Sequence, residues 1–430
     1  AYLEIIKHEG YTKDIRNITE FMNYKTSIIC TLFSVLFFTA CAPKIEMVSL
    51  GINEEYAVER MRLLHLHPEF TGESYLWTMK DSLGNDSVIS TERDLFFVAS
   101  KVGTYYIRLN IIDNTDPVEH NVKVVVWQEQ VAYSRYITKV YEYRPAPGQF
   151  VNLLPEYKEG DTEESMCDKV LECIGDKNDV LISLGGYGGY VTFGFDHTVV
   201  NAPGEMDFKI LGNSFYAEAN PNPNAPESGG SSEPGIVMVA LDRNGNGLPD
   251  DEWYELAGSE YHKPETVHNY TITYYRTPSD HVATPIPQTP ITDTSYIAWI
   301  ANDGSTGYIE KNSYHRQEYF PQWIDSDEIT FSGTRLAHNA IDESGIGSYY
   351  VLYAYDWGYA DNHPNEVEDK SCFNIDWAVD KDGNPVHLDG ADFIRVFTGV
   401  NQSCGWLGET STELCRAEDL HIELSTIPNP

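Results

Sequence analysis

The stretch "GTYYIRLNIID", residues 103–113, alternates apolar with other side chains along nearly its whole length. Successive side chains of a β-strand point to opposite sides, so every second residue of this stretch falls on one face. That face carries Tyr105, Ile107, Leu109 and Ile111. A period of two with one apolar face predicts a strand that packs on a core and exposes its other face to solvent.

Three segments around this stretch carry strand signals, and polar turns separate them. They are "SYLWTM" (74–79), "DLFFVAS" (94–100) and "HNVKVVVW" (120–127). Short strands at this spacing predict a small β-sandwich over residues 42–128. Tyr75 and Trp77, followed by "GTYYIRLNIIDN" and "VKVVV", resemble a PKD-like module of the immunoglobulin type. The resemblance implies a domain that acts as a spacer.

The next part of the chain contains a break and the clearest helix signal. We expect residues 129–160 to be a linker, because "RPAPGQ" (144–149) interrupts regular structure. In "GDTEESMCDKVLECIG" (160–175), Asp161 or Thr162 can cap a helix that ends at Gly175. Acidic residues in its first turn suit the helix dipole. The apolar stripe of this helix consists of Met166, Val170, Leu171 and Ile174.

Beyond residue 180 the chain consists of strand signals and long loops. Helices do not alternate with strands, which disfavours a parallel α/β domain. We therefore expect an all-β protein, in which the PKD-like sandwich is followed by a larger antiparallel jelly-roll-type sandwich over residues 161–430 with one short helix. The predicted strands lie in "YVTFGFD" (190–196), "DFKILGNSF" (207–215), "GIVMVALD" (235–242), "NYTITYYR" (269–276), "EITFSG" (328–333), "SYYVLYAYDWG" (348–358) and "DFIRVFTGV" (392–400).

The composition limits the partners of the protein. The 430 residues include 66 acidic and 29 basic side chains, which gives a formal net charge of −37. A field of this sign repels nucleic acid and anionic membrane surfaces, so we expect no nucleic-acid partner, and it attracts cations. Aromatic residues make up 13% of the chain, 29 of them Tyr, which is typical of β proteins that bind through their surfaces.

Residues 22–41 have the order of a bacterial lipoprotein signal. Met22 and Lys25 precede an apolar run that is too short to span a bilayer. The run ends in "LFFTAC" (36–41), which resembles a lipobox and implies cleavage before Cys41 and acylation of its thiol. We expect residues 1–21 to be an upstream extension outside the fold. The mature protein is then expected in the outer membrane at the cell surface, held there through its lipid anchor only.

The cysteines do not indicate a disulfide framework. The chain has seven, and five remain when Cys30 and Cys41 are set aside. An odd number argues against complete pairing, although Cys404 and Cys415 can pair across a loop. No CxxC pattern predicts a metal site.

A polar loop, "DRNGNGLPDDEW" (242–253), follows one of the predicted strands. Asp242, Asn244, Asn246 and Asp250 supply side-chain oxygens, and Leu248 offers its carbonyl. Calcium takes about six to eight such oxygens. The twelfth position, where an EF-hand needs Glu, holds a Trp, and the loop instead resembles the calcium loops of thrombospondin type-3 repeats. Two hypotheses stay open: a weak calcium site, which would make calcium the cofactor, or a polar turn between two strands.

Two further loops place aromatic rings beside polar groups. "YDWGYADNHPN" (355–365) contains Trp357, Tyr359, Asp361 and His363, and "VNQSCGWLGETST" (400–412) contains Trp406. Aromatic faces next to hydrogen-bonding groups suit a sugar or another flat ligand, so these five are the candidate ligand-binding residues. The structural alternative is a buried Trp at the end of a strand, followed by a polar loop.

No catalytic pattern stands out, because the chain has no nucleophile elbow, no HExxH and no triad spacing. "LGGYGGY" (184–190) lies between strand signals, so its glycines predict a close approach of strands and not a phosphate cradle. Carboxylates are too numerous for one pair to be singled out, which leaves a glycosidase open.

Five strings in combination resemble a family of Bacteroidota cell-surface lipoproteins, some of which are encoded with outer-membrane uptake systems, including those for corrinoids. The strings are "SLGGYGGYVTFGFDH" (183–197), "LGNSFYAE" (211–218), "SSEPGIVMVALDRNGNGLPDDEWYELAGSE" (231–260), "NIDWAVDKDGNPVHLDGADFIRVFTGVN" (374–401) and "GWLGETSTE" (405–413). The resemblance implies non-catalytic capture of a small ligand, a glycan or a corrinoid, for a TonB-dependent transporter. A carbohydrate-active hydrolase or lyase and a structural or adhesive surface protein are the alternatives.

Overall fold

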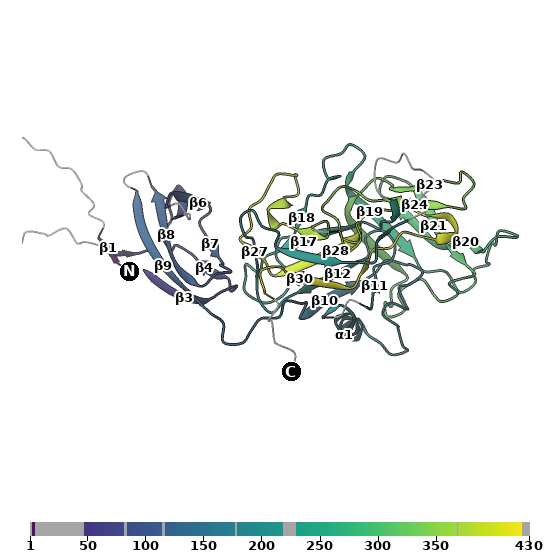
Figure 1. Ribbon diagram of the computed structural model, residues 1–430, viewed down its shortest axis with the longest axis horizontal. Helices are drawn as coiled ribbons and strands as arrows, with labels where there is room; N and C mark the ends of the chain where they lie inside the picture. The colour runs from purple at the N-terminus through teal and green to yellow at the C-terminus, as the bar shows by residue number, and fades with distance from the viewer. Residues whose placement is uncertain are drawn as a thin grey trace, which may run out of the picture. The chain divides into compact units, whose positions relative to one another are not determined.

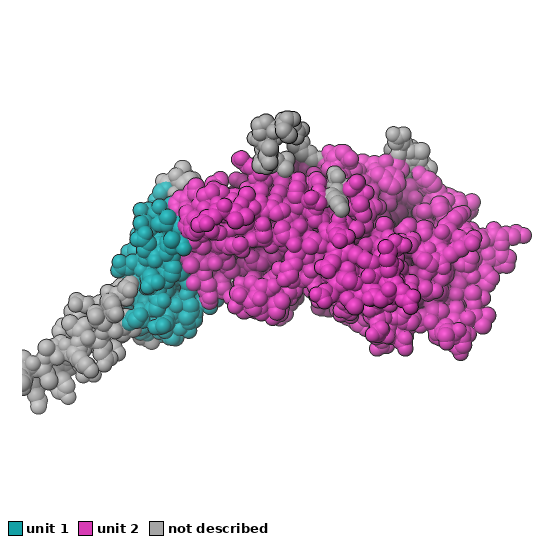
Figure 2. Space-filling view, turned by 90° about the horizontal axis from the view of Figure 1, so that it is seen from below, with its two compact units in different colours: residues 1–57, 66–95, 104–125 teal, residues 58–65, 96–103, 126–430 magenta. Residues whose placement is uncertain are grey.

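The computed structural model describes residues 2–4, 47–80, 84–113, 117–176, 179–217, 229–367 and 369–423. Within these ranges the fold is all-β, with antiparallel strand pairs and a single α-helix, as the sequence predicts. The predicted signal at 22–41, with Cys41, lies outside the described residues. The chain divides into two compact units (Figure 2): residues 1–57, 66–95 and 104–125 form unit 1, and residues 58–65, 96–103 and 126–430 form unit 2.

A five-stranded sheet dominates the N-terminal part of the chain. Its spatial order is β3 (Glu55–Glu59), β9 (Val118–Trp127), β8 (Gly103–Ile112), β5 (Ser74–Lys80) and β6 (Asp86–Ser90). The predicted alternation is confirmed in β8, where Ile107, Leu109 and Ile111 are at most 1% exposed. Trp77 of β5 lies opposite Leu109 and is fully buried. Two short pairs complete this region: β1 (Tyr2–Glu4) with β2 (Met47–Ser49), and β4 (Leu64–Leu66) with β7 (Leu95–Phe97).

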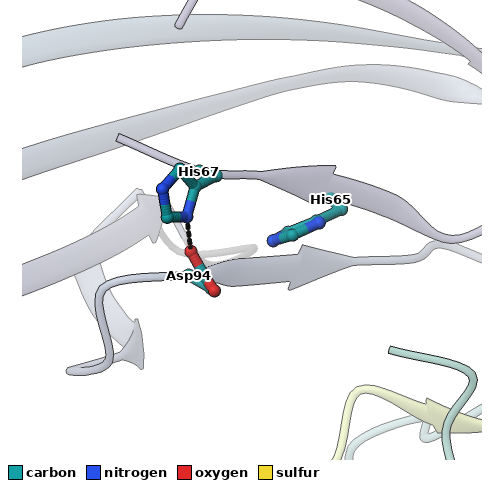
Figure 3. A group of neighbouring side chains, drawn as sticks. All are labelled: His65, His67 and Asp94. Atoms are coloured by element: carbon teal, nitrogen blue, oxygen red, sulfur yellow. Dashed lines mark hydrogen bonds and ion pairs between the residues drawn. The ribbon is translucent and has the colours of Figure 1, made fainter. Parts of the chain in front are cut away.

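A histidine–carboxylate pair lies beside the ends of β4 and β7. His67 follows β4, Asp94 precedes β7, and Nδ1 of His67 hydrogen-bonds the Asp94 carboxylate (Figure 3). The two side chains are 46% and 36% exposed. A polar contact this exposed to solvent adds little to stability, so we assign this pair a local structural role.

Unit 2 contains two main sheets. The six-stranded sheet has the order β10 (Lys139–Arg144), β12 (Tyr190–Gly194), β28 (Phe393–Thr398), β17 (Gly235–Ala240), β18 (Tyr254–Leu256) and β26 (Ala378–Val379). The four-stranded sheet has the order β21 (Thr306–Asn312), β20 (Ile291–Ala301), β19 (Val267–Tyr275) and β22 (Glu328–Arg335). Figure 1 shows the central strands of the larger sheet side by side.

Smaller sheets and two turns of 3₁₀-helix connect these layers. The sheets are β25 (Cys372–Phe373), β14 (Phe208–Leu211) and β30 (Arg416–Asp419); β15 (Phe215–Tyr216), β16 (Gly229–Ser231), β24 (Tyr350–Tyr353) and β23 (Ala340–Asp342); β11 (Ile182–Ser183) with β29 (Glu413–Leu414); and β13 (Val199–Val200) with β27 (Gly390–Ala391). The 3₁₀ turns are η1 (Ile375–Trp377) and η2 (Gly405–Leu407).

One hydrophobic core joins the two main sheets of unit 2. It contains Phe193 and Ile394 from the larger sheet, and Ile272 and Ile297 from the smaller one. Five of the six residues of β28 are buried, so its sequence is apolar on both sides and lacks a clean alternation. The shared core gives unit 2 the layered architecture of a β-sandwich.

The predicted helix forms as α1 (Glu163–Ile174). Thr162, one of the two predicted caps, accepts a hydrogen bond from Ser165 N at 3.2 Å, and Ser165 Oγ accepts one from Thr162 N at 2.8 Å. Met166 and Val170 are fully buried in the core. Gly175 ends the helix as predicted. The helix therefore covers the larger sheet with its apolar stripe, next to β10 (Figure 1).

Cys404 and Cys415 are both free thiols, so the pairing of these two residues that the sequence allowed is not formed. Burial raises the pKa of both thiols to about 11, which keeps them protonated and unreactive near neutral pH. Among the described residues, no helix is long and apolar enough to cross a membrane.

Candidate ligand-binding site

A cavity of about 360 Å³ opens on unit 2. All four strands of the smaller main sheet contribute to its wall, together with loops near residues 187, 304, 338 and 402. Its aromatic lining consists of Tyr187, Tyr270, Tyr274, Trp299 and Tyr308. Aromatic walls with a few polar groups are the usual lining of small-molecule sites.

The position of the Trp299 indole depends on a glycine in the neighbouring strand. Trp299 of β20 is the cross-strand partner of Gly307 of β21. A Cβ atom at residue 307 would lie 2.4 Å from Cζ2 of Trp299, closer than any real contact. The absence of a side chain at Gly307 therefore lets the indole lie across β21, where it forms part of the cavity wall.

Three tyrosines are held in place by hydrogen bonds and ring contacts. The Tyr274 hydroxyl donates to Tyr187 O at 3.2 Å, and Asn401 Nδ2 donates to the Tyr270 hydroxyl at 3.1 Å. The rings of Tyr187 and Tyr270 meet edge to face with centroids 5.1 Å apart. These contacts fix the aromatic wall before a ligand arrives, which reduces the entropy lost on binding.

Two polar groups of the cavity wall lack partners among the residues that the structure describes. The Tyr187 hydroxyl and Nε of Arg335 are both buried without a hydrogen bond. The Arg335 guanidinium lies 4.9 Å above the Tyr270 ring centroid. A buried polar group without a partner costs about 1–3 kcal/mol, so the cavity wall carries polar atoms at a cost in stability.

The charges of the lining favour a neutral ligand. Three carboxyl groups line the cavity, those of Asp303, Glu310 and Glu409, against the single guanidinium of Arg335. Burial, followed by the charge of Arg335, lowers the pKa of His338, which keeps this imidazole neutral. An anionic ligand would meet an excess of negative charge, whereas hydroxyl groups can donate to carboxylates and accept from Arg335.

Gln149, only 2% exposed, connects the loop of residues 400–412 to the end of β21. Its backbone N–H donates to Glu409 Oε1 at 2.6 Å, and its side-chain Nε2 donates to Leu407 O at 2.7 Å. Its Oε1 accepts from Asn312 Nδ2 at 2.7 Å. The loop that supplies one wall of the cavity is thus fixed by a buried network in which the amide of Gln149 is fully used.

Asp361, one of the sequence-predicted ligand residues, is 3% exposed and binds backbone. Its Oδ1 accepts from Asn213 N at 2.8 Å and Ser214 N at 2.9 Å, and its Oδ2 accepts from Glu413 N at 2.9 Å. Three backbone N–H groups converge on one carboxylate. Asp361 therefore joins the segment after β14 to β29, a structural role that sequence alone did not indicate.

Asp361 also belongs to a group of three carboxyls with Glu233 and Glu413, whose nearest oxygens lie within 4.8 Å of one another. Glu233 and Glu413 line a second cavity of about 350 Å³, and Glu409 lines both cavities. Burial raises the pKa of Glu233, and burial with the charge of Glu233 raises the pKa of Glu413. The group therefore retains protons at pH values where exposed carboxyls have lost theirs.

The other predicted ligand residues lie apart from both cavities, and their binding role remains a prediction. Tyr359 is 2% exposed, and its hydroxyl accepts from Glu260 N at 3.0 Å. The Trp357 ring lies 4.7 Å from that of Trp377. The hydroxyl of Tyr216 is 2.6 Å from Nδ1 of His363. The structure therefore places Asp361 beside the carboxyl groups of Glu233 and Glu413. The side chains of Trp357, Tyr359 and His363 instead contact neighbouring protein side chains or backbone.

Sequence patterns single out Trp406 and its loop but not the aromatic wall, and a binding role for Trp406 stays a prediction. Trp406 is 40% exposed on η2, and residues on both sides of it line the first cavity. The signal that sequence did offer is the run of Tyr270 and Tyr274 at alternate positions of "NYTITYYR". The pairing of Tyr274 with Trp299 depends on the strand order, which no local pattern contains.

The predicted calcium loop is closed by its own hydrogen bonds. Asp242 accepts from Asn246 N at 3.1 Å and Gly247 N at 2.8 Å. Asn244 Nδ2 and Asn246 Nδ2 donate to Asp250 at 2.9 Å and 3.0 Å, which lowers the pKa of that carboxyl. The side chain of Asn246 also accepts from Leu248 N at 2.7 Å. The predicted ligands are brought together, and calcium binding stays a prediction.

A second loop, residues 342–347, has a similar hydrogen-bond pattern although it lacks one of the oxygen ligands. The Asp342 carboxylate accepts hydrogen bonds from Gly347 N at 2.7 Å and from Ser344 N at 3.1 Å. The Asp242 carboxylate likewise accepts from Gly247 N in the first loop. Where the first loop has Asn246, four residues after Asp242, the second loop has Ile346, whose side chain has no oxygen. Loop shape alone therefore does not distinguish a calcium site from a polar turn.

No protein-family model matches this chain, and no curated protein sequence matches it. Among solved structures, the chain is similar to a SusE-like protein with a TM-score of 0.25 and 8% sequence identity, and the match covers 84% of this chain and 95% of that one. A similarity of this strength carries no information about ligand or partner. The geometry of the cavities is what supports a function.

Proposed function

We propose that the protein is a non-catalytic, glycan-binding lipoprotein and that the 360 Å³ cavity is its binding site. The supporting observation is the aromatic wall in which Trp299 lies across Gly307 beside unpartnered polar groups. Sugar rings present C–H groups on their faces and hydroxyls at their edges. Aromatic rings contact the faces, and carboxylates and Arg335 bond the hydroxyls.

The volume of the cavity favours a sugar over a corrinoid. Small-molecule sites have volumes of about 300–1,000 Å³, and this one lies near the lower limit. A corrin macrocycle with its side chains is much larger than a sugar ring, and burying most of it requires a site near the upper limit. We therefore place a glycan in the cavity and keep a corrinoid as a competing titrant.

The setting that we propose is an outer-membrane nutrient-uptake system. The lipobox-like "LFFTAC" ending at Cys41 supports a lipid anchor, and the strongly acidic composition disfavours nucleic acid as a partner. A lipid-anchored binder at the cell surface would deliver its glycan to a TonB-dependent transporter. The N-terminal sheet would then act as a spacer between the anchor and unit 2.

Isothermal titration calorimetry with a panel of neutral oligosaccharides tests this function. We expect at least one of gluco-, xylo-, manno- or galacto-oligosaccharides to bind. Trp299→Ala and Arg335→Met should each weaken binding at least about tenfold, because an aromatic contact or a charged hydrogen bond contributes about 1–3 kcal/mol. Arg335→Met keeps the apolar stem, so it tests the guanidinium without opening the core.

The control is Phe215→Ala, because Phe215 is 56% exposed and lines neither cavity. Its affinity should equal that of the wild type. If no oligosaccharide of the panel binds while a corrinoid does, the assignment of a glycan is wrong. If a glycan binds equally well to both cavity variants, the site is wrong.

A hydrolase is the second candidate, because Glu233 and Glu413 form a close carboxyl pair beside the 350 Å³ cavity. Retaining glycosidases place two carboxyl groups about 5–5.5 Å apart. Reducing ends released from a bound oligosaccharide, and lost in Glu233→Gln, would establish this activity. We expect none, because Glu413 is only 5% exposed and Asp361 holds its backbone N–H.

A further inference from the structure

We propose that the glycan site continues out of the cavity onto Trp406 and Tyr314, and that the ligand is a neutral, linear oligosaccharide longer than the cavity holds. This inference rests on the proposed function. Trp406 is 40% exposed and Tyr314 is 66% exposed, and their ring centroids lie 6.2 Å apart. We call these two residues the outer aromatic pair.

Exposed aromatic rings that touch each other form a platform that water covers poorly. The Trp406 and Tyr314 rings meet at 67°, and the neighbouring Leu407 is also 42% exposed. Three partly exposed apolar side chains are thus neighbours in sequence or in ring contact at this place. Flat aromatic surfaces beside polar backbone suit the C–H face of a sugar ring.

Hydrogen bonds anchor the Trp406 indole and the backbone of Tyr314. Trp406 Nε1 donates to Ser348 O at 3.3 Å, and Tyr314 N donates to Asn312 Oδ1 at 3.0 Å. Asn312 is in turn bound to Gln149, which holds Leu407 O on the other side of the platform. A platform fixed by a buried network loses little entropy when a ligand lies on it.

Both segments that carry the outer pair also line the cavity. Ser403 lines it three residues before Trp406, and Glu310 lines it four residues before Tyr314. A chain spans at most about 3.6 Å per residue. The Cα atom of Trp406 therefore lies within about 11 Å of that of Ser403, and the Cα atom of Tyr314 within about 14 Å of that of Glu310. These separations are short enough for an extended oligosaccharide to bridge.

The charge of the protein selects among linear polymers. With a net charge of −37, the molecule repels polyanions such as acidic polysaccharides and nucleic acids. The carboxyl groups of Asp303 and Glu310 in the cavity wall act in the same direction at short range. A neutral oligosaccharide meets neither penalty, and its hydroxyl groups match the cavity lining.

The test compares short and long members of the oligosaccharide series that binds best, with Trp406→Ala and Tyr314→Ala. In the wild type, affinity should rise with chain length beyond a single sugar. Each variant should lose about tenfold in affinity for the long oligosaccharide and keep the affinity of the wild type for the shortest ligand that binds. Trp406→Tyr should restore most of the loss, because it keeps an aromatic face.

The outcomes separate this inference from the proposed function. If the long and short ligands bind the wild type equally and Trp406→Ala changes neither, the outer subsite does not exist, although the cavity still binds. If no neutral oligosaccharide binds at all, the proposed function itself fails. Phe215→Ala serves as the matched control for loss of an exposed aromatic ring, and the melting temperature of each variant confirms that it is folded.

Discussion

Gly408 lies so close to Gln149 that a Cβ atom at residue 408 would come within 1.8 Å of Nε2 of Gln149. The backbone of Gly408 has φ +94° and ψ −154°, a region that only glycine occupies readily. Both the space and the conformation therefore require glycine. Since Gln149 fixes the loop that carries Glu409 and Trp406, this one contact sets the shape of the proposed site.

Gly408→Ala should destabilise the protein and weaken binding together. We expect the free energy of unfolding to fall by about 1–3 kcal/mol from backbone strain, with a further loss from displacement of Gln149. Gly160→Ala is a matched control, because Gly160 has the same φ of +94° and nothing within 4 Å of a built Cβ. Urea unfolding should show strain alone in Gly160→Ala, with binding intact. Equal effects of both substitutions on affinity would contradict a role for the Gln149 contact.

Stability should fall as the pH rises from 5 to 8, because buried carboxyls disfavour ionisation. Burial raises the pKa of Glu255 from the ordinary value of 4.5 to about 7, and burial likewise raises the pKa of Glu409 to about 7. Between pH 4.5 and about pH 7, each of these carboxyl groups loses its proton in the unfolded chain and keeps it in the folded chain. The contribution of the protonated carboxyl to the free energy of unfolding is thus complete below pH 4.5 and is lost as the pH rises through about 7.

Glu255→Gln tests the sign of this effect at one position. The amide oxygen can still accept the hydrogen bond that Thr334 Oγ1 now donates to Glu255 at 2.6 Å. Melting temperatures of the variant should fall less steeply than those of the wild type between pH 5 and pH 8. An unchanged slope would mean that Glu255 is ionised in the folded protein throughout this range.

The two similar loops allow a controlled test of calcium. If residues 242–250 bind the ion, calcium in about hundredfold excess over its Kd should stabilise the wild type by about 2.7 kcal/mol. Asp242→Ala should abolish this increase, whereas Asp342→Ala should retain it, because that loop has Ile346 where Asn246 stands. A calorimetric melt with calcium and with chelator measures both. No response in the wild type would leave the loop as a polar turn.

Cys41→Ala should move the protein from the membrane fraction to the soluble fraction of the cell. The thiol of Cys41 is the expected site of acylation, and the anchor is expected to be the lipid alone. Fractionation followed by immunoblotting measures the shift. A variant that remains in the membrane fraction to the same extent would show that something else holds the protein there.

The sequence predicted strands well where one face meets the core and the period stays intact. Ile107, Leu109 and Ile111 illustrate this, because each lies on the buried side of β8. The strand β20 was missed for a physical reason. Its pairing with β21 shifts register near Ile291 and again near Asp293, so the period of two is interrupted.

The candidate site was harder to predict than the fold, because it depends on strand order. Trp299 and Gly307 meet only through the register of β20 and β21, and Gln149 reaches Glu409 across 260 residues of sequence. Local composition did mark the loop of Trp406. Local composition also pointed to Tyr359 as a ligand residue, although Tyr359 is buried. The polar residues next to it in the sequence gave no sign of this burial.

The most direct test of the central claim is a crystal structure of the protein with the oligosaccharide that binds most tightly. We predict that one sugar ring lies in the 360 Å³ cavity against Trp299, and that the chain continues toward Trp406 and Tyr314. Density for the sugar in the acidic cavity beside Glu233, or only on another face of the molecule, would contradict the account.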